Sequence, residues 1–577
     1  MQIRFPLCVL VATAAAVTVL AQQPDADAAK LKEQRRTALT ARVASDADQL
    51  KLPENRALIH ARLGVIAWRN DAEHGKKLFQ TAVGELNAAQ QEAESAKGRS
   101  HLYQDLLNSQ NLRPQILNII AGVDPEFALE SLYRTRPANV ARAMAGEASE
   151  KINDQVANRA YLVQAEMNLE QRLIRMAADK NPEKAAAMLK DTIRKRLSNE
   201  TYESLKKLYL LDASAGTELA DDVLSRLNSA SFLKDNQPVW DLLQLSTSMI
   251  TDHIRERGPD EKYLAFNDAR IRTLSVKLLG SYTDNAARIG YVPFEQLEPI
   301  AKRYSPGMIE KLRKAAESPG SGWVGHRRRP SNPEYESFVK TNPSAEQMVQ
   351  NAGRFSPDVQ RQLFQNAANK FTESGQYQNA MALLNDKFDG DALDNAVSSL
   401  NWHYANHLMQ KGEFDAAEAL MLEFNESNRV SGLISLAQNV YNGDPAANKG
   451  TSINLLRRVR GLISDQPENY NETSQLFSLI NAMAAIEPAE AFANLEPLID
   501  PFNTLIQAFA VVQGYQGGQL RQGEYQLANG NNFGIYIDQG MFRNLAVADF
   551  DRTNALIDSL ARPELRISLR MYLAEGL

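Results

Sequence analysis

A short pattern at the start of predicted helices recurs along the chain and limits its fold more than any other feature. Its clearest copies are DPEFALESL (124–132), NPEKAAAML (181–189) and EPAEAFANL (487–495). In each copy a capping-type residue precedes Pro at the first helical position, where the amide that Pro lacks would have no helical partner. Ala and an aliphatic residue follow three and seven residues after Pro, on one helix face. A small residue there lets a second helix approach closely.

The same pattern recurs at intervals typical of a helical array. In NHLMQKGEFDAAEALMLEF (406–424), Gly412 ends one helix and Phe414 begins the next. Tyr377 and Phe414 are 37 residues apart, and Phe414 and Pro488 are 74 apart, twice that interval. Periods of this length with two helices per unit indicate an α-solenoid, in which each pair buries its apolar face against its neighbours. The sequence therefore predicts an all-α fold, an α-solenoid of antiparallel helix hairpins.

Two of these units carry a resemblance to a known repeat. Residues 364–387 and 401–424 resemble tetratricopeptide repeats, although Asn401 stands where a bulky aromatic residue is usual. The closing proline of the repeat is replaced by Ala392 or Arg429. The chain also resembles uncharacterised exported helical-repeat proteins of bacteria. The resemblance implies an architecture and supplies no reaction. The matching positions are Phe364, Ala368, Phe371, Gly375, Tyr377, Ala380 and Leu384, and then Ala405, Leu408, Gly412, Phe414, Ala417 and Met421.

The N-terminus predicts export. Residues 1–21 combine Arg4, an apolar run from Phe5 to Leu20 and a cleavage site of small residues before Gln22, as in a signal peptide. The alternative is a membrane anchor, but the run has 16 residues, and a spanning helix needs about 20. Cys8 is the only cysteine and lies inside this segment, so the mature chain would hold no thiol. We expect a periplasmic or secreted protein without a transmembrane segment in the mature chain.

Composition shifts divide the rest of the chain. An irregular helical-repeat region is expected at 22–317, a linker rich in Pro and Gly at 318–346, and tetratricopeptide-like repeats at 347–512. A Gly- and Tyr-rich insertion at 513–543 is expected to form a β-hairpin or an ordered loop. Its turn would lie at Asn529-Gly530, a strong hairpin signal. A terminal helical hairpin follows at 544–577.

Two segments supply the candidate partner-binding residues. The linker holds Trp323 beside Arg327, Arg328 and Arg329, which could bind an anionic polymer, a lipid headgroup or an acidic partner, or form a solvated run of charge. The insertion holds aromatic side chains of the kind that dominate interfaces, or that could cover the solenoid as a lid. These side chains are Tyr515, Tyr525, Phe533 and Tyr536.

The sequence offers no catalytic, cofactor-binding or metal-binding residue. His403 and His407 have metal-ligand spacing, but Tyr404 stands where the zinc-peptidase motif needs Glu. Glu373 precedes Ser as in some enzymes that cut peptidoglycan strands, yet it lies at a repeat turn. The glycine-rich segment that should follow in such an enzyme is absent. Nucleophile elbows, phosphate loops and dinucleotide fingerprints are also absent.

The expected function is therefore that of a scaffold or adaptor. A net charge of −6 argues against a nucleic-acid partner, because such affinity is mostly cationic. Solenoids usually present an extended curved surface, so we expect non-catalytic binding of a protein partner along the concave face, without a cofactor. The alternative is a protein that binds or processes a cell-envelope polymer, either peptidoglycan or another glycan.

Overall fold

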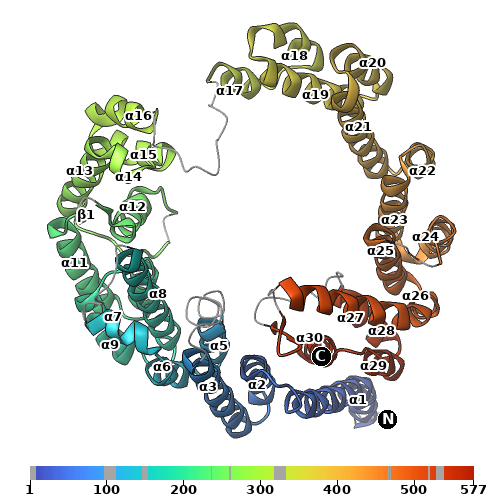
Figure 1. The fold of residues 1–577 in the computed structure, drawn as a ribbon, viewed down its shortest axis with the longest axis horizontal. Helices are drawn as coiled ribbons and strands as arrows, with labels where there is room; N and C mark the ends of the chain where they lie inside the picture. Colours follow the sequence, from blue (N-terminus) through green and yellow to red (C-terminus); the bar gives the residue numbers. More distant parts are fainter. Residues whose placement is uncertain are drawn as a thin grey trace, which may run out of the picture. The chain divides into compact units, whose positions relative to one another are not determined.

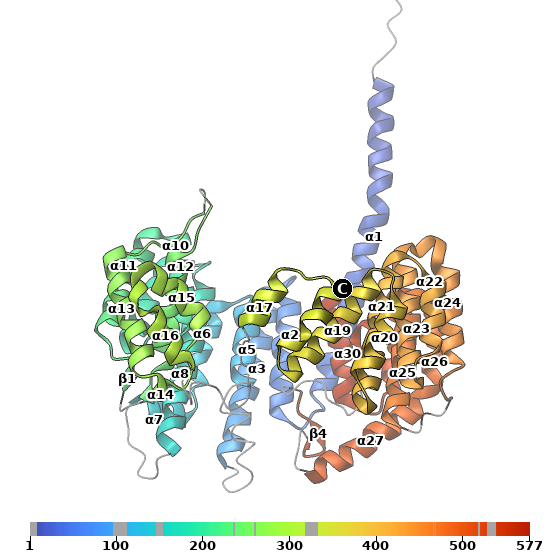
Figure 2. The same ribbon diagram turned by 90° about the horizontal axis from the view of Figure 1, so that it is seen from above.

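The computed structural model describes residues 8–95, 112–145, 154–234, 237–258, 261–317, 333–465, 467, 469–516, 520–527 and 538–577. The described part is built mainly from α-helices (Figure 1; Figure 2). The chain divides into two compact units, each with its own internal packing. Unit 1 comprises Met1–Asp46, Arg329–Tyr525 and Gly530–Leu577, and unit 2 comprises Ala47–Arg328 and Gln526–Asn529.

Unit 2 is a stack of antiparallel helix pairs. The first helices of successive pairs, α2, α5, α8, α10 and α12, pack on one another in chain order and are followed by α15. In Figure 1, α8 and α12 lie along the inner edge of this unit, and α9, α11 and α13 lie along its outer edge. The elements are α2 (Pro53–Trp68), α3 (Ala72–Ser95), α5 (Leu112–Ala121), α6 (Pro125–Arg134), α7 (Ala138–Ala145), α8 (Asp154–Ala177), α9 (Pro182–Lys195), α10 (Glu200–Leu211), α11 (Ala213–Ser229), β1 (Leu233–Lys234), β2 (Gln237–Pro238), α12 (Trp240–Ile254), α13 (Asp268–Asp284), α14 (Ala286–Ile289), α15 (Phe294–Tyr304), η2 (Pro306–Met308) and α16 (Ile309–Glu317).

Unit 1 repeats this arrangement with more regular pairs. Its first helices α19, α21, α23 and α25 pack side by side, and Figure 1 shows α20, α22 and α24 outside them. The elements are α1 (Cys8–Ala47), α17 (Pro333–Lys340), α18 (Ala345–Asn351), η3 (Ala352–Arg354), α19 (Pro357–Glu373), α20 (Tyr377–Lys387), α21 (Gly390–Lys411), α22 (Phe414–Leu422), α23 (Glu426–Gly443), α24 (Pro445–Arg460), α25 (Tyr470–Ile486), α26 (Pro488–Leu495), η4 (Glu496–Leu498), α27 (Ile499–Gln516), β3 (Leu520–Arg521), β4 (Glu524–Tyr525), α28 (Gln539–Ala548), α29 (Phe550–Asp558) and α30 (Pro563–Gly576).

The recurring sequence pattern forms the turn of each hairpin. The Asp124 carboxylate accepts a hydrogen bond from the Phe127 amide at the start of α6, and Asn181 caps α9 in the same way. These caps satisfy helix amides that would otherwise lack a partner. At the end of α21, Gly412 adopts a left-handed φ of 77°, which glycine reaches without strain. The predicted α-solenoid of antiparallel hairpins is confirmed.

Small residues let the paired helices approach closely. Ala380 in α20 and Ala417 in α22 are fully buried. Gly216 in α11 lies so near α10 that an added Cβ would stand 2.5 Å from the Cα of Tyr209. Because Tyr209 Cα belongs to the backbone, a side chain at this position would push the two helices apart.

Helix α1 makes a contact that the sequence pattern did not reveal. Leu39 and Val43 of α1 are fully buried. Arg570 of α30 donates to Asp46 at 2.5 Å and also pairs with Asp558. Leu565 and Ile567 lie on opposite sides of α30, and both are buried. Helix α30 is therefore enclosed on more than one side, and the Arg570–Asp46 pair links it to α1.

The segments predicted as linker and insertion differ from expectation. Residues 318–332 lie outside the described part, but α17 occupies 333–340, so the predicted linker is partly helical. A small β-hairpin near the C-terminus is confirmed, with Leu520 opposite Tyr525. Its turn is at Gln522-Gly523, where both residues have positive φ, and the predicted turn at Asn529-Gly530 lies outside the described residues. A second two-stranded ladder, β1 with β2, was not predicted.

Candidate functional site

A large groove crosses three inner helices of unit 2. We call it the α12 groove, because α12 forms its floor and α10 and α15 form its sides. Its volume is about 1010 Å³, at the upper end of ordinary ligand pockets. The floor carries the short side chains Thr247, Ser248 and Thr251, which leave the space open. The lining residues are Tyr202, Glu203, Lys206, Thr247, Ser248, Thr251, Asp252, Ile254, Arg255, Glu295, Gln296, Pro299, Lys302 and Arg303.

One end of the α12 groove is fixed by a polar network around Asp252. The Tyr202 hydroxyl donates to Asp252, and Arg257 pairs with the same carboxylate at 3.2 Å. Burial alone would raise the pKa of Asp252, but the hydrogen bond from Tyr202 and the charge of Arg257 lower it below its usual value. Burial and the bond to Asp252 raise the pKa of Tyr202. The acid is therefore ionised and the phenol neutral at physiological pH, as a positioning network requires.

Charges of both signs line the two sides of the α12 groove. On α10, Lys206 pairs with Glu203 at 2.7 Å. On α15, Lys302 pairs with Glu298 at 3.1 Å. Arg303, the next residue, forms no ion pair with a carboxylate among the described residues. A groove with exchangeable ion pairs along its sides and short side chains on its floor can hold a polypeptide segment that carries charges of both signs.

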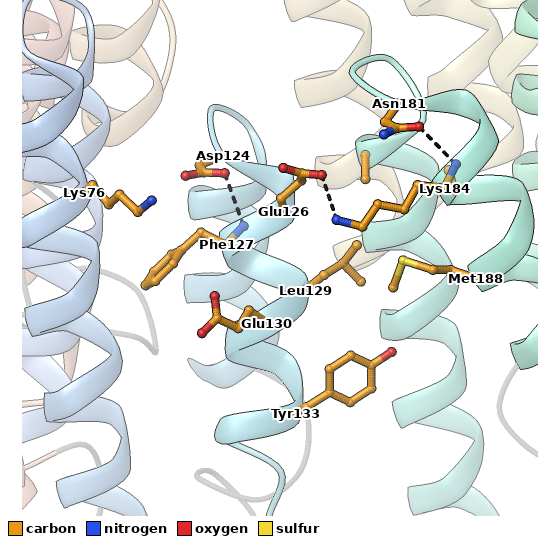
Figure 3. A pocket seen from close by; sticks show the side chains of 12 residues that line it. Lys76, Asp124, Glu126, Phe127, Leu129, Glu130, Tyr133, Asn181, Lys184 and Met188 are labelled. Carbon is orange, nitrogen blue, oxygen red and sulfur yellow. Dashed lines mark hydrogen bonds and ion pairs between the residues drawn. The ribbon is translucent and has the colours of Figure 1, made fainter.

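A second groove lies between α6 and α9 in unit 2, with α3 beside it, and Figure 3 shows it closely. This α6–α9 groove has a volume of about 500 Å³. Its apolar lining includes Leu129 from α6 and Met188 from α9, which point toward one another, while Phe127 points to the other side of α6 (Figure 3). Lys184 pairs with Glu126 across the rim at 2.9 Å, and this pair lowers the pKa of Glu126.

A buried ion network supports the α6–α9 groove from beneath. The Tyr133 hydroxyl in the groove donates to Glu170 at 2.9 Å. Arg113 binds Glu166 with both of its terminal nitrogens, and Arg136 binds Glu166 at 2.7 Å. Burial alone would raise the pKa of Glu166, but the two arginines lower it. This network joins α5, α6 and α8, and so holds α6, one wall of the groove, in position.

A third, smaller groove in unit 1 follows from one sequence departure. It has a volume of about 330 Å³ and is lined by Asn385, Asn401, Asn425 and Asn428 among others. Asn401 fills the position where the repeat usually has a bulky aromatic residue, and it accepts a hydrogen bond from the Tyr377 hydroxyl at 2.6 Å. The small amide therefore leaves space that an indole would fill.

The structure changes the interpretation of the predicted aromatic anchors. Tyr525 is only 3% exposed, and its ring lies 5.0 Å from the Arg562 guanidinium. Its amide donates to Glu564 at 2.9 Å, so this part of the insertion packs into the helical body and Tyr525 cannot meet a partner there. Tyr515 belongs to α27, but its side chain lies outside the described set. The other predicted partner residues, Phe533, Tyr536, Trp323, Arg327, Arg328 and Arg329, also lie outside the described residues.

The histidine pair and the Glu-Ser pair meet in the structure. Nε2 of His403 lies 3.3 Å from the Glu373 carboxylate, which links α21 to the end of α19. The described residues contain no group of three or more His, Cys, Asp or Glu that could hold a metal ion. None of the described helices has both the length and the apolar character that crossing a membrane requires.

Sequence reasoning missed the groove residues of α12. The only local signal is the run STSMITD (246–252), which places hydroxyl side chains on a helix face. Ser and Thr are weak helix formers, so several of them together indicate a helix face that needs short side chains. The walls of the groove come from α10 and α15, and only the tertiary structure brings these helices together.

Comparisons with known proteins give the chain no family. No family model matches it, and no curated protein matches it. Among solved structures, one match is described as a circular tandem repeat protein with novel repeat topology and enhanced subunit contact surfaces. That match has 13% sequence identity, covers 94% of this chain and 96% of the other, and has a TM-score of 0.11. The assignment of this chain to the helical solenoids rests on the packing described above.

Proposed function

We propose that the protein is a non-catalytic scaffold or adaptor that binds a segment of a protein partner in the α12 groove. The observation that carries this proposal is a groove of about 1010 Å³ that crosses the first helices α10 and α12 and then α15. Successive helices of a repeat array supply successive contacts along an extended ligand, which is how such arrays usually bind.

The chemistry of the groove favours a polypeptide partner. The apolar parts of the lining can bury side chains, while Lys206, Arg255 and Arg303 can pair with acidic groups on a partner. Glu203 and Asp252 would repel a uniformly anionic polymer, which agrees with the expectation of no nucleic-acid partner. No catalytic role is proposed for these carboxylates, because each is engaged in an ion pair.

The proposal also covers the type of repeat and the location of the protein. We propose that α19–α22 are tetratricopeptide-like hairpins and that the chain is exported, with its signal peptide removed after Ala21. A periplasmic or secreted location would bring the protein close to envelope partners. Mass spectrometry of the N-terminus of the protein isolated from its host tests this directly. A mature chain that begins at Gln22 is expected, and one that retains residues 1–21 contradicts export with cleavage.

Site-specific photo-crosslinking in the host tests the groove itself. A photoreactive residue replaces Thr251, which is exposed in the floor of the α12 groove and has no side-chain hydrogen bond among the described residues. The matched control replaces Asp222, an exposed residue on the outer helix α11. We expect a discrete crosslinked protein at position 251 and none at position 222.

A charge reversal then tests whether the crosslink reports specific binding. Arg303→Glu should abolish or strongly reduce the crosslinked product at position 251, because it removes a cation from the wall of the groove. The opposite result, equal crosslinking at 251 and 222 or no effect of Arg303→Glu, would exclude the α12 groove as the partner site.

A further inference from the structure

The first helices of unit 1 share a solvent-facing surface without formal charge. We call it the uncharged face. It runs across α19, α21, α23 and α25, and each helix contributes positions spaced three or four residues apart, which lie on one side of a helix. Its residues are Gln362, Gln365, Asn366 and Asn369 of α19; Asn395, Ser399, Trp402, His403, Asn406 and Gln410 of α21; Ser431, Ser435, Gln438 and Asn442 of α23; and Asn471, Ser474, Gln475, Ser478 and Asn481 of α25.

The uncharged face is continuous because its helices are neighbours. Helix α19 packs on α21, α21 on α23, and α23 on α25. Figure 1 shows α21, α23 and α25 on the side of unit 1 that faces away from α22 and α24. The residues of the face are exposed or half-buried, while the other sides of the same helices hold fully buried residues such as Ala368 and Leu436.

Most of the carboxamides on this face are not used within the protein. Among the described residues, no side-chain hydrogen bond is found for Gln362, Gln365, Asn366, Asn369, Asn395, Asn406, Gln410, Gln438, Asn442 or Asn471. A carboxamide offers both donors and acceptors, so this surface presents many neutral hydrogen-bonding groups in a row.

The absence of charge on this face is unusual for this chain. Charged residues make up 23% of the sequence and normally concentrate on the surface. The outer helices of the same hairpins follow this rule, since Arg458 pairs with Glu418 at 2.5 Å and Lys449 pairs with Glu487 at 2.9 Å. Charge borders the α19 part at its two ends, where Asp358 pairs with Arg361 at 2.7 Å and Glu373 pairs with His403 at 3.3 Å.

One aromatic ring interrupts the polar surface. Trp402 is half-buried, and its ring packs 5.5 Å from that of Phe424. This contact holds the indole in place while leaving part of it open to solvent. A fixed, partly exposed aromatic ring among carboxamides can stack on the apolar face of a ligand ring while neighbouring amides bond its polar edge.

We propose that the uncharged face binds a strand of a neutral glycan. A glycan offers hydroxyl, ring-oxygen or acetamido groups along its length and flat, apolar ring faces, which match carboxamides and one indole. An anionic polymer would find no unpaired cation on this face, since Arg361 at its edge is paired with Asp358 and His403 with Glu373. A protein partner is disfavoured because protein interfaces are enriched in Arg, Met and several aromatic residues, and this face has only Trp402. The glycan site lies in unit 1 and is independent of the α12 groove.

Titration calorimetry with defined sugars tests the proposal on the full-length purified protein. The probes are hexasaccharides of β-1,4-linked N-acetylglucosamine, β-1,4-linked glucose and α-1,4-linked glucose, with a hexamer of galacturonic acid as the anionic comparison. We expect at least one neutral hexasaccharide to bind with a Kd below about 1 mM, and the anionic hexamer to bind more weakly. Failure of all three neutral probes, or tighter binding of the anionic one, would overturn the proposal.

Matched variants locate the binding. Trp402→Ala should weaken binding about tenfold, and Asn406→Lys should weaken it as well. Gln378→Lys on the outer helix α20 adds the same charge at another exposed position and should change nothing. Arg303→Glu in the α12 groove should also leave glycan affinity unchanged. The glycan site can therefore be tested whether or not the α12 groove binds a protein partner. Equal affinity in the wild type, Trp402→Ala and Asn406→Lys would place any glycan elsewhere and refute the site.

Discussion

The substitution Gly216→Ala gives a sharp test of how the hairpins pack. Gly216 lies near the start of α11, and a Cβ there would stand 2.5 Å from the Cα of Tyr209 and 2.6 Å from its backbone nitrogen. An ordinary contact begins at 3.4 Å, so α10 and α11 would have to separate by about 0.9 Å. Because both nearest atoms are backbone atoms, no side-chain rotation can relieve the clash.

The expected change is the balance of two opposing effects. Replacing Gly by Ala inside a helix stabilises it by about 1 kcal/mol through backbone propensity. Overpacking of a close contact costs about 1–3 kcal/mol, and occasionally more. The clash here is severe and involves backbone, so we expect Gly216→Ala to destabilise the protein by about 1–2 kcal/mol overall.

Gly84→Ala provides the matched control. Gly84 lies within α3, is exposed, and an added Cβ there would meet no atom within 4 Å. This variant should gain about 1 kcal/mol, so the two glycine substitutions should shift the melting temperature in opposite directions. Thermal unfolding measures the shifts, and hydrogen–deuterium exchange should show faster exchange in α10 and α11 of Gly216→Ala. A Gly216→Ala protein as stable as Gly84→Ala would refute the close packing of this hairpin.

Three further predictions address packing, charge and pH. Ala380→Leu or Ala417→Leu should each destabilise the protein by about 1–3 kcal/mol, because both sites are fully buried. Unchanged melting temperatures would show that these alanines do not lie where neighbouring helices pack. Glu166→Gln should cost about 3–5 kcal/mol in thermal unfolding, because it leaves the buried Arg113 without its counter-charge; a loss below 1 kcal/mol would show that the network is dispensable. Burial lowers the pKa of His60 from 6.5, so the unfolded chain binds more protons than the folded one below that pH. The neutral His60 imidazole therefore makes its full contribution to stability above about pH 6.5. This contribution is lost as the pH falls through the pKa of His60 in the folded protein. Between pH 5 and 8, the melting temperature of His60→Gln should vary less with pH than that of the wild type. The same pH dependence in both proteins would disprove this role of His60.

The local parts of the fold could be predicted from the sequence because their causes are local. A cap, a Pro and a small residue are enough to specify each turn, as Asp124 and Asn181 show. The turn at Gly412 is equally local, since it needs only a left-handed residue after the last helical turn.

Contacts between distant parts of the chain could not be predicted in this way. The Arg570–Asp46 pair joins residues 524 positions apart, and neither residue has a sequence signal for the other. The described hairpin lies inside the predicted insertion, and its turn at Gln522-Gly523 depends on a non-glycine residue with positive φ, which the sequence pattern does not indicate. The surrounding polar contacts of Tyr525 and Glu564 explain why this part of the insertion is held against the helices.

The candidate surfaces were only partly visible from the sequence. Asn401 was recognised as a departure from the repeat, and the structure shows that it opens a small groove. The α12 groove and the uncharged face depend on which helix sides remain open after the pairs have stacked. Burial decides this, and the same Asn or Ser could lie on either side of a helix until the neighbouring helices are known.

The most direct test of the account is to map the α12 groove in the complex that position 251 captures. Hydrogen–deuterium exchange would be measured on the protein alone and on the protein with its purified partner. The account predicts slower exchange in α10, α12 and α15, with α11 and α13 unchanged. Slower exchange confined to α11 and α13, or no change in unit 2, would contradict the claim that this groove is the partner-binding surface.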